Sequence, residues 1–295
     1  MASLLVRVRT KLSLHVRHKA RSPLLGDYPS LHKGRSMDFD DLREYERGDD
    51  VRDIDWKSTA RTGSVLLKRY VAVRKQNVLV VVDTGRSMTA LAKDGTAKSE
   101  LAVLIAGIFG SVVVDHGDLV GLLAGDRGGR ALAPWRATDR HLEQILRSVQ
   151  ERLAVATATS DVAGLLRQVR DQHRRRLVVA VITDEGGWSD EVAELVRRLR
   201  VQHDIVWFTI LDLDLTADHL ADRDLVDVVD GVRLPAELRA DPTVRADYLA
   251  AVAAAAASRR DQLAELGVAA EDVAGEDDAI PAVLRLLHRT RRVSA

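Results

Sequence analysis

The sequence predicts an α/β protein in which a mostly parallel central sheet is flanked by helices. Three short runs of β-branched and other apolar residues, at 78–82, 177–182 and 205–211, are too short for helices and apolar on both faces. Helical patterns separate these runs, so right-handed crossovers should connect parallel strands. Hydrophobic residues make up 46% of the 295 residues and charged residues 30%, which is enough for a sizeable core.

The remaining elements follow from hydrophobic periodicity and from residues that start or stop helices. Helices are expected where apolar residues recur at helical spacing, with Ser189 as an N-cap for one of them. The expected helices are 99–115, 139–153, 161–170, 190–199, 244–266 and 280–292. Short strands are expected at 119–123 and 225–232.

The amino-terminal third differs in charge from the rest. Residues 1–36 form a basic arm with eight Lys or Arg side chains against the single acid Asp27. Apolar residues at helical spacing favour a helix near its start, although the alternation in LVRVR also permits an edge strand. Residues 37–76 carry an acidic, Trp-containing motif and a strand at 64–75. We expect that strand to form a hairpin with the segment that follows it, and residues 37–76 to pack on a main domain formed by 77–295.

Composition excludes several classes of protein. Lys plus Arg total 44 and Asp plus Glu total 44, so no uniform basic field is present for specific nucleic-acid binding. The absence of cysteine excludes disulfides, thiolate zinc sites and cysteine nucleophiles. No window approaches the roughly 20 apolar residues of a transmembrane segment, and the start lacks a signal-peptide core. We therefore expect a cytoplasmic protein. The sequence also contains no Walker-type phosphate loop.

Two predicted strands end in aspartate, Asp83 and Asp184, and hydroxyl residues at 157–160 open a helix between them. The carboxyl ends of parallel strands meet at one edge of a sheet, where ligands bind. Carboxylate and hydroxyl oxygens are hard ligands that suit Mg²⁺. Two interpretations follow: a cation site at this edge, or aspartates that only cap neighbouring helix starts.

The segment VLVVVDTGRSM resembles the first strand and metal-ion-dependent adhesion site of a von Willebrand factor type A domain, which is a Rossmann-like fold. FDDLREYERGDDVRDIDWKSTARTG resembles the signature of the domain of unknown function 58 family, in which a type A-like domain follows that motif. The likeness runs in order from about 34 to 292, through GDLVGLL, VVAVITDEGGW and HDIVWFTILD.

The resemblance implies a set of metal-site residues. Asp83 matches the first Asp of the adhesion-site pattern, Ser87 its second Ser, and Asp184 its later Asp, while the Thr of the pattern is matched by Ser160 or Thr159. Gly85 stands where the first Ser belongs and offers no side-chain oxygen. Mg²⁺ binding at this site is therefore an open expectation.

The acidic motif permits two interpretations of its own. Its charged and aromatic residues form either a surface that recognises a partner or an ion-pair network that pins the segment in place, and we prefer the network. The residues concerned are Arg43, Asp49, Asp50, Arg52, Asp53, Asp55, Trp56 and Arg61.

The resemblance also implies a function. Similar proteins are commonly paired with MoxR-type AAA+ ATPases, which predicts a non-enzymatic adaptor or chaperone-like module that binds another protein. No Ser/His/Asp or acid/base pair can be placed in one cleft, in agreement with binding over catalysis. The alternative is a metal-dependent phosphodiester hydrolase that uses Asp53, Asp55 and Lys57, with the basic arm holding the polyanion.

Overall fold

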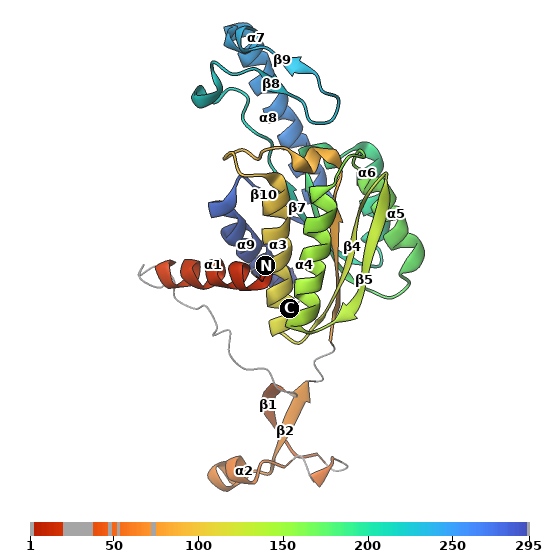
Figure 1. Cartoon of the computed structure of the whole chain (residues 1–295). Coiled ribbons are helices and arrows are strands. Elements are labelled where there is room, and N and C mark those ends of the chain that lie inside the picture. Colours follow the sequence, from red (N-terminus) through yellow and green to blue (C-terminus); the bar gives the residue numbers. More distant parts are fainter. Residues whose placement is uncertain (1–2, 20–37, 47–48, 52–53, 72–74, 294–295) are drawn as a thin grey trace. The chain divides into compact units, whose positions relative to one another are not determined.

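The structure, a computed structural model, describes residues 3–19, 38–46, 49–51, 54–71 and 75–293 (Figure 1). It divides into two units. The core unit comprises Met1–Asp27 and Gln76–Ala295, and the hairpin unit comprises Tyr28–Lys75.

The core unit contains a six-stranded sheet with the order β10-β7-β6-β3-β4-β5. All neighbouring pairs are parallel except β4 and β5, which are antiparallel. This confirms the predicted fold class. The strands are β3 (Asn77–Asp83), β4 (Leu119–Asp126), β5 (Gly129–Arg136), β6 (Val178–Asp184), β7 (Asp204–Ile210) and β10 (Ala269–Val273).

Helices cover both faces of this sheet and create two hydrophobic cores. Val78, Val80 and Val82 of β3 face the larger core, whereas Leu79 and Val81 face the other, as the alternation of side chains along a strand requires. The helices that contribute to the larger core are α1 (Leu4–Lys19), α3 (Lys98–Asp115), α4 (Asp139–Ala154) and α9 (Glu276–Val293). The helices that contribute to the second core are α5 (Val162–Gln172), α6 (Asp190–Leu199) and α8 (Pro242–Glu265).

The start of the chain is helical, which confirms the helix expected there. Leu5 and Val8 of α1 are buried, and Figure 1 shows the helix lying across α3. The carboxylate of Glu143 in α4 accepts hydrogen bonds from the backbone N–H groups of Leu4 and Leu5, at 3.2 and 2.8 Å, and so caps the helix. Gly107 of α3 permits the close approach, because a Cβ there would lie 2.7 Å from Val8 Cγ2.

Most other helix predictions are also confirmed. Ser189 caps α6 by accepting a hydrogen bond from the backbone N–H of Val192. The expected strand at 225–232 is only β8 (Leu225–Val226), which pairs with β9 (Arg233–Leu234); α7 (Ala236–Ala240) and α8 follow. None of the helices in the described part of the chain combines the length and the hydropathy needed to cross a bilayer.

The hairpin unit corrects one prediction. It holds β1 (Asp38–Glu44), α2 (Trp56–Thr62) and β2 (Leu66–Val71), and β2 pairs with β1, the strand before it. The expectation that 64–75 pairs with the following segment is wrong. The reason is that β3 has parallel neighbours on both edges, β4 and β6, and no edge remains for β2. The packing of residues 37–76 on the main domain stays a prediction.

Candidate functional site

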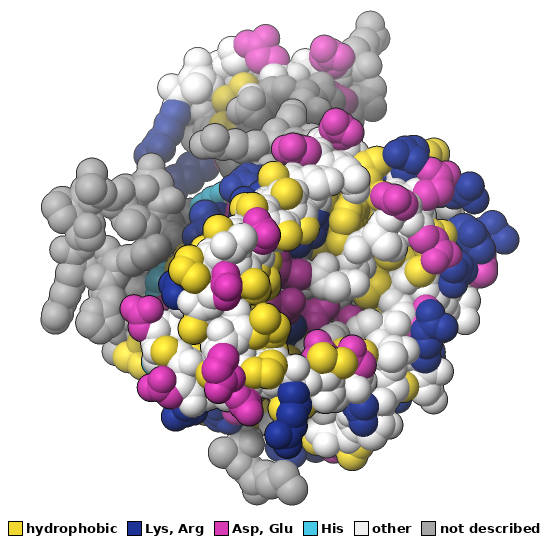
Figure 2. Space-filling model, turned by 90° about the horizontal axis from the view of Figure 1, so that it is seen from above, with side chains coloured by type: hydrophobic (Ala, Val, Ile, Leu, Met, Phe, Trp, Pro, Cys, Tyr) yellow, Lys and Arg dark blue, Asp and Glu magenta, His cyan; other side chains and the backbone are white. Residues whose placement is uncertain are grey.

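Polar side chains gather where β3 and β6 end, because these two strands are neighbours and both run toward the same edge of the sheet. Ser160 Oγ donates a hydrogen bond of 2.6 Å to Asp83 Oδ2, and Ser87 Oγ lies 3.3 Å from Ser160 Oγ. We refer to Asp83, Ser87, Ser160 and Asp184 as the carboxylate–hydroxyl cluster. Seen from above in Figure 2, the surface is hollowed and acidic side chains gather inside the hollow.

Asp83 is the most buried carboxylate of the cluster, with 1% of its surface exposed. Burial raises the pKa of Asp83 from 3.8 to about 6. Hydrogen bonds from Ser160, from the Gly85 backbone N–H at 2.9 Å and from Thr183 Oγ1 at 3.0 Å act in the opposite direction, and the negative charge of Asp184 adds to the rise. Both oxygens of Asp83 are therefore occupied by neutral donors.

The hydroxyl groups form the part of the cluster that solvent can reach. Ser87 lies in the short 3₁₀ turn η2 (Arg86–Thr89), and both Ser87 and Ser160 are partly exposed. Thr159 is exposed, and its carbonyl accepts a hydrogen bond from the Arg127 backbone. The resemblance allowed either Ser160 or Thr159 to match the Thr of the adhesion-site pattern, and the structure places Ser160 in contact with Asp83.

Gly85 lacks a side-chain ligand, and it also allows Ser160 to pack closely against the loop. A Cβ at this position would lie 2.4 Å from both the backbone N and the Oγ of Ser160. The Arg86 N–H also donates to the Ala158 carbonyl at 2.8 Å, which holds the two loops together. Ser160 thus fills the space that a side chain at residue 85 would need, and a serine ligand cannot be added there without moving a loop.

Sequence reasoning missed Lys98, the first residue of α3. Its side chain is 3% exposed, and Nζ contacts Asp184 Oδ2 at 3.0 Å and also pairs with Asp212. Burial opposes the charged form of Lys98, but the two carboxylates outweigh it, so the pKa of Lys98 is raised. A signal was present in the sequence. A lysine in the first turn of a helix is disfavoured by the helix dipole, which indicates nearby carboxylates.

The resemblance implies a divalent cation here, and the cluster offers an incomplete set of ligands for it. In favour, Asp184 Oδ1 is buried and has no hydrogen-bond partner among the described residues. Against it, Asp83 is occupied by three donors, Asp184 is held by Lys98 and Gly85 has no side-chain oxygen. No group of three or more His, Cys, Asp or Glu residues in the described chain could hold a metal. The residues thus do not fit Mg²⁺ well, and its binding stays a prediction.

A second set of charges connects α8 to the same edge of the sheet. Arg259 is 4% exposed, and its guanidinium lies 3.3 Å from both Glu185 Oε1 and Asp272 Oδ1. The other oxygen of Glu185 accepts a hydrogen bond of 3.0 Å from the Asp212 backbone N–H. The loop between β8 and β9 is joined to η2 by a bond of 3.3 Å from Arg86 to the Val229 carbonyl.

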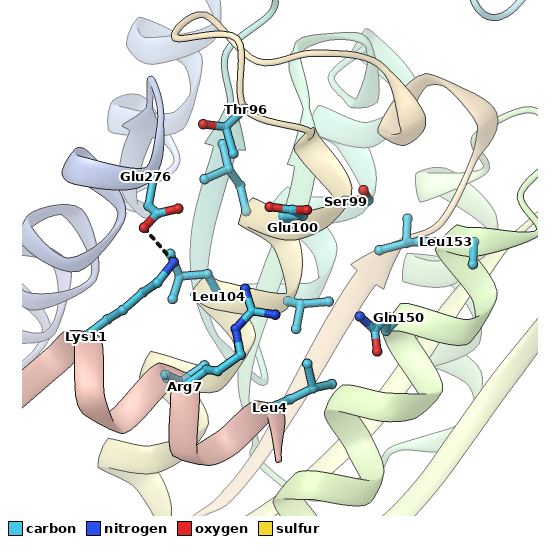
Figure 3. A pocket seen from close by; sticks show the side chains of 14 residues that line it. Leu4, Arg7, Lys11, Thr96, Ser99, Glu100, Leu104, Gln150, Leu153 and Glu276 are labelled. Atoms are coloured by element: carbon cyan, nitrogen blue, oxygen red, sulfur yellow. Dashed lines mark hydrogen bonds and ion pairs between the residues drawn. The ribbon is translucent and has the colours of Figure 1, made fainter. Parts of the chain in front are cut away.

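A separate cavity of about 250 Å³ lies between α1, α3, α4 and the start of α9 (Figure 3). Its lining includes Leu4, Leu104 and Leu153, and the ion pair between Lys11 and Glu276 lies at its edge. Leu4 and Leu104 also belong to the core that seats α1, so we assign the cavity to the packing of that helix. It contains none of the predicted site residues.

The acidic motif is only partly described. Arg52 and Asp53 lie outside the described residues, as does the side chain of Arg43. Asp55 caps α2 by accepting hydrogen bonds from the backbone N–H groups of Lys57 and Ser58, at 3.0 and 3.1 Å. Among the others, Asp49 accepts a bond of 2.9 Å from the Glu46 backbone, and Asp50, Trp56 and Arg61 are exposed. Partner recognition, the ion-pair network and the hydrolase alternative with Asp53, Asp55 and Lys57 all stay predictions.

Among solved structures, the chain is similar to the conserved hypothetical protein BatB of Bacteroides thetaiotaomicron. The two share 11% identity over 74% of this chain and 99% of that one, with a TM-score of 0.48. An aerotolerance-related membrane protein of Bacteroides fragilis matches with 13% identity over 72% and 99% of the two chains and a TM-score of 0.46. A von Willebrand factor type A domain, that of SpRpn10, matches with 13% identity over 48% and 78% and a TM-score of 0.35.

Sequence comparison identifies relatives at greater identity. An uncharacterized protein of Mycobacterium tuberculosis and one of Mycobacterium bovis are each 30% identical over 248 residues, which is 82% of this chain and 76% of the relative. The family model described as protein of unknown function DUF58 matches residues 41–258, from the acidic motif through the carboxylate–hydroxyl cluster to α8. The chain therefore belongs to the DUF58 family.

Proposed function

We propose that this protein is a non-enzymatic adaptor that binds another protein at the carboxylate–hydroxyl cluster. The observation that carries the proposal is the burial pattern of the cluster. Asp83 and Asp184 are 1% and 2% exposed, whereas Ser87 and Ser160 are partly exposed at the sheet edge. A partner would therefore meet hydroxyl groups that are held in place by buried charges, which is an arrangement for docking.

The contacts of the cluster support binding over catalysis. Ser160 donates directly to Asp83, and within the described residues neither Ser87 nor Ser160 is hydrogen-bonded to a histidine. A serine nucleophile requires a base that accepts its proton and is itself oriented by a third group. Asp83 cannot play that part efficiently, because Thr183 and the Gly85 backbone already occupy it.

A segment with exposed apolar side chains is tied to the cluster by one hydrogen bond, and we propose that it enlarges the interface. Arg86, next to Ser87, bonds the carbonyl of Val229, and residues 226–252 expose several large apolar side chains. Exposed apolar side chains that gather in one segment are typical of protein-binding surfaces. They are Val226, Val228, Val229, Val232, Leu238, Val244, Leu249 and Val252.

The partner that we propose is a MoxR-type AAA+ ATPase, as the family resemblance implies. The chain has no Walker-type loop of its own, so a partner of this class would supply ATP hydrolysis while the adaptor presents a client protein. Since such a partner consumes ATP, we expect the two proteins to meet in the cytoplasm.

Binding of the purified full-length chain to the MoxR-type ATPase of its own organism tests this proposal. We expect Ser87→Ala combined with Val229→Glu to weaken binding at least ~10-fold, which corresponds to about 1.4 kcal/mol. The matched control is Leu132→Glu, which changes an exposed leucine on the edge strand β5 (61% exposed). Equal affinities for the wild type, the double variant and the control would refute docking at this surface.

A further inference from the structure

The buried ammonium of Lys98 stands beside the position where a divalent cation would balance the charge of the cluster. Asp184 ends β6 and Asp212 follows the neighbouring strand β7, and Lys98 Nζ pairs with both. Lys98 and Asp184 are 3% and 2% exposed, so neither charge is stabilised by bulk water. A buried carboxylate needs a counter-charge or a full set of hydrogen bonds.

We infer that Lys98 replaces a divalent metal ion as the permanent counter-charge of the carboxylate–hydroxyl cluster, so that the cluster is assembled without metal. The inference concerns the same cluster as the proposed function, but it does not depend on the identity of a partner. Three features of the cluster support it: the ion pair of Lys98 with Asp184, the hydrogen bonds to Asp83 and the packing at Gly85.

The first feature is the ion pair itself. An ammonium group that bonds Asp184 Oδ2 at 3.0 Å holds the carboxylate that a cation at this edge would have to recruit. To bind Mg²⁺, the protein would have to place a second positive charge beside a buried lysine. Like charges in a poorly hydrated environment repel strongly, so the ammonium opposes the ion.

The second feature is at Asp83. Its two oxygens accept hydrogen bonds from the Gly85 N–H, Ser160 Oγ and Thr183 Oγ1, at 2.9, 2.6 and 3.0 Å. These neutral donors satisfy the carboxylate without a cation.

The third feature is the packing at Gly85. Ser160 fills the space that a serine side chain at residue 85 would need, so a cation here would also lack that hydroxyl ligand.

The position of Lys98 in the chain strengthens the argument. Lys98 opens α3, an 18-residue helix whose amino-terminal end carries a partial positive charge. A lysine is unfavourable there unless carboxylates surround it, and its backbone N–H is tied to the Ala90 carbonyl at 2.9 Å. The helix end and the ammonium together supply the positive potential that the aspartates require.

Thermal unfolding of the full chain with and without metal tests the inference. Wild type should unfold at the same Tm in EDTA, in millimolar MgCl₂ and in NaCl of matched ionic strength. Lys98→Met should lower the Tm in EDTA by on the order of 10 °C, because it leaves the buried carboxylate of Asp184 without a counter-charge. MgCl₂, but not NaCl, should recover part of this loss, since the vacated space now favours a cation.

The matched control is Lys93→Met, which removes an exposed lysine from the loop that precedes α3. It should change neither the Tm nor the response to MgCl₂. A saturable rise in the wild-type Tm with MgCl₂ would overturn the inference, as would a Lys98→Met protein that folds and ignores MgCl₂. If Lys98→Met does not fold, Mn²⁺ titration of the wild type by electron paramagnetic resonance decides: no bound Mn²⁺ supports the inference, and one tight site refutes it.

Discussion

Replacing Asp83 with asparagine removes a carboxyl group whose pKa differs strongly between the folded and unfolded chain. Burial raises that pKa from 3.8 to about 6, so the folded protein favours the protonated acid. The contribution of this group to stability is therefore complete below about pH 4 and is lost as the pH rises through about 6. The difference between the two pKa values corresponds to about 3 kcal/mol in the free energy of unfolding.

Urea unfolding followed by tryptophan fluorescence, in EDTA and between about pH 4 and pH 7, measures this effect. Asp83→Asn cannot ionise, so its free energy of unfolding should improve relative to wild type by about 3 kcal/mol across that range. Asp222→Asn, a change at an exposed aspartate, is the control and should follow wild type at every pH. A difference between Asp83→Asn and wild type that does not vary with pH would refute the reasoning.

Three further substitutions probe other contacts. Gly85→Ser should lower the free energy of unfolding by about 1–3 kcal/mol in chemical denaturation, and an unchanged stability would show that its loop has room to move. Arg259→Met should cost about 1–3 kcal/mol because it removes the buried guanidinium that pairs with Glu185 and Asp272. The exposed Arg260→Met should cost less than about 1 kcal/mol, and equal losses would contradict this account. Val8→Asp should detach α1 from α3, because it places a charge in the core, and should speed limited proteolysis near the start of the chain. The control Leu14→Asp changes an exposed residue and should not, and similar cleavage rates for the two variants would argue against the packing of α1 on α3.

The strands at the centre of the sheet could be predicted because their sequences alone specify burial on two faces. Residues 78–82 are all apolar and mostly β-branched, a pattern that suits a strand with a neighbour on each side. The edge strands lack such a pattern. β5 contains Pro134 and β10 contains Glu271 and Asp272, so their strand conformation comes from pairing with β4 and β7 and not from local preference.

The aspartates of the site could be predicted for the same topological reason. The position of Lys98 at a helix start indicates carboxylates nearby, but the sequence does not identify them, because Asp212 lies 114 residues further along the chain. The sequence also could not predict whether Thr159 or Ser160 contacts Asp83. Neighbouring residues in a loop point in different directions, and only the folded structure shows that Ser160 donates the hydrogen bond.

Helix α1 has a consequence for the order in which the molecule assembles during synthesis. The backbone N–H groups of Leu4 and Leu5 are satisfied by Glu143, which lies 139 and 138 residues further along the chain, and the apolar side chains of the helix pack on α3. The ribosome therefore produces this helix long before the surface that receives it. Until α4 emerges, an apolar stripe at the start of the nascent chain has no native partner, so docking of α1 should be among the late events of folding.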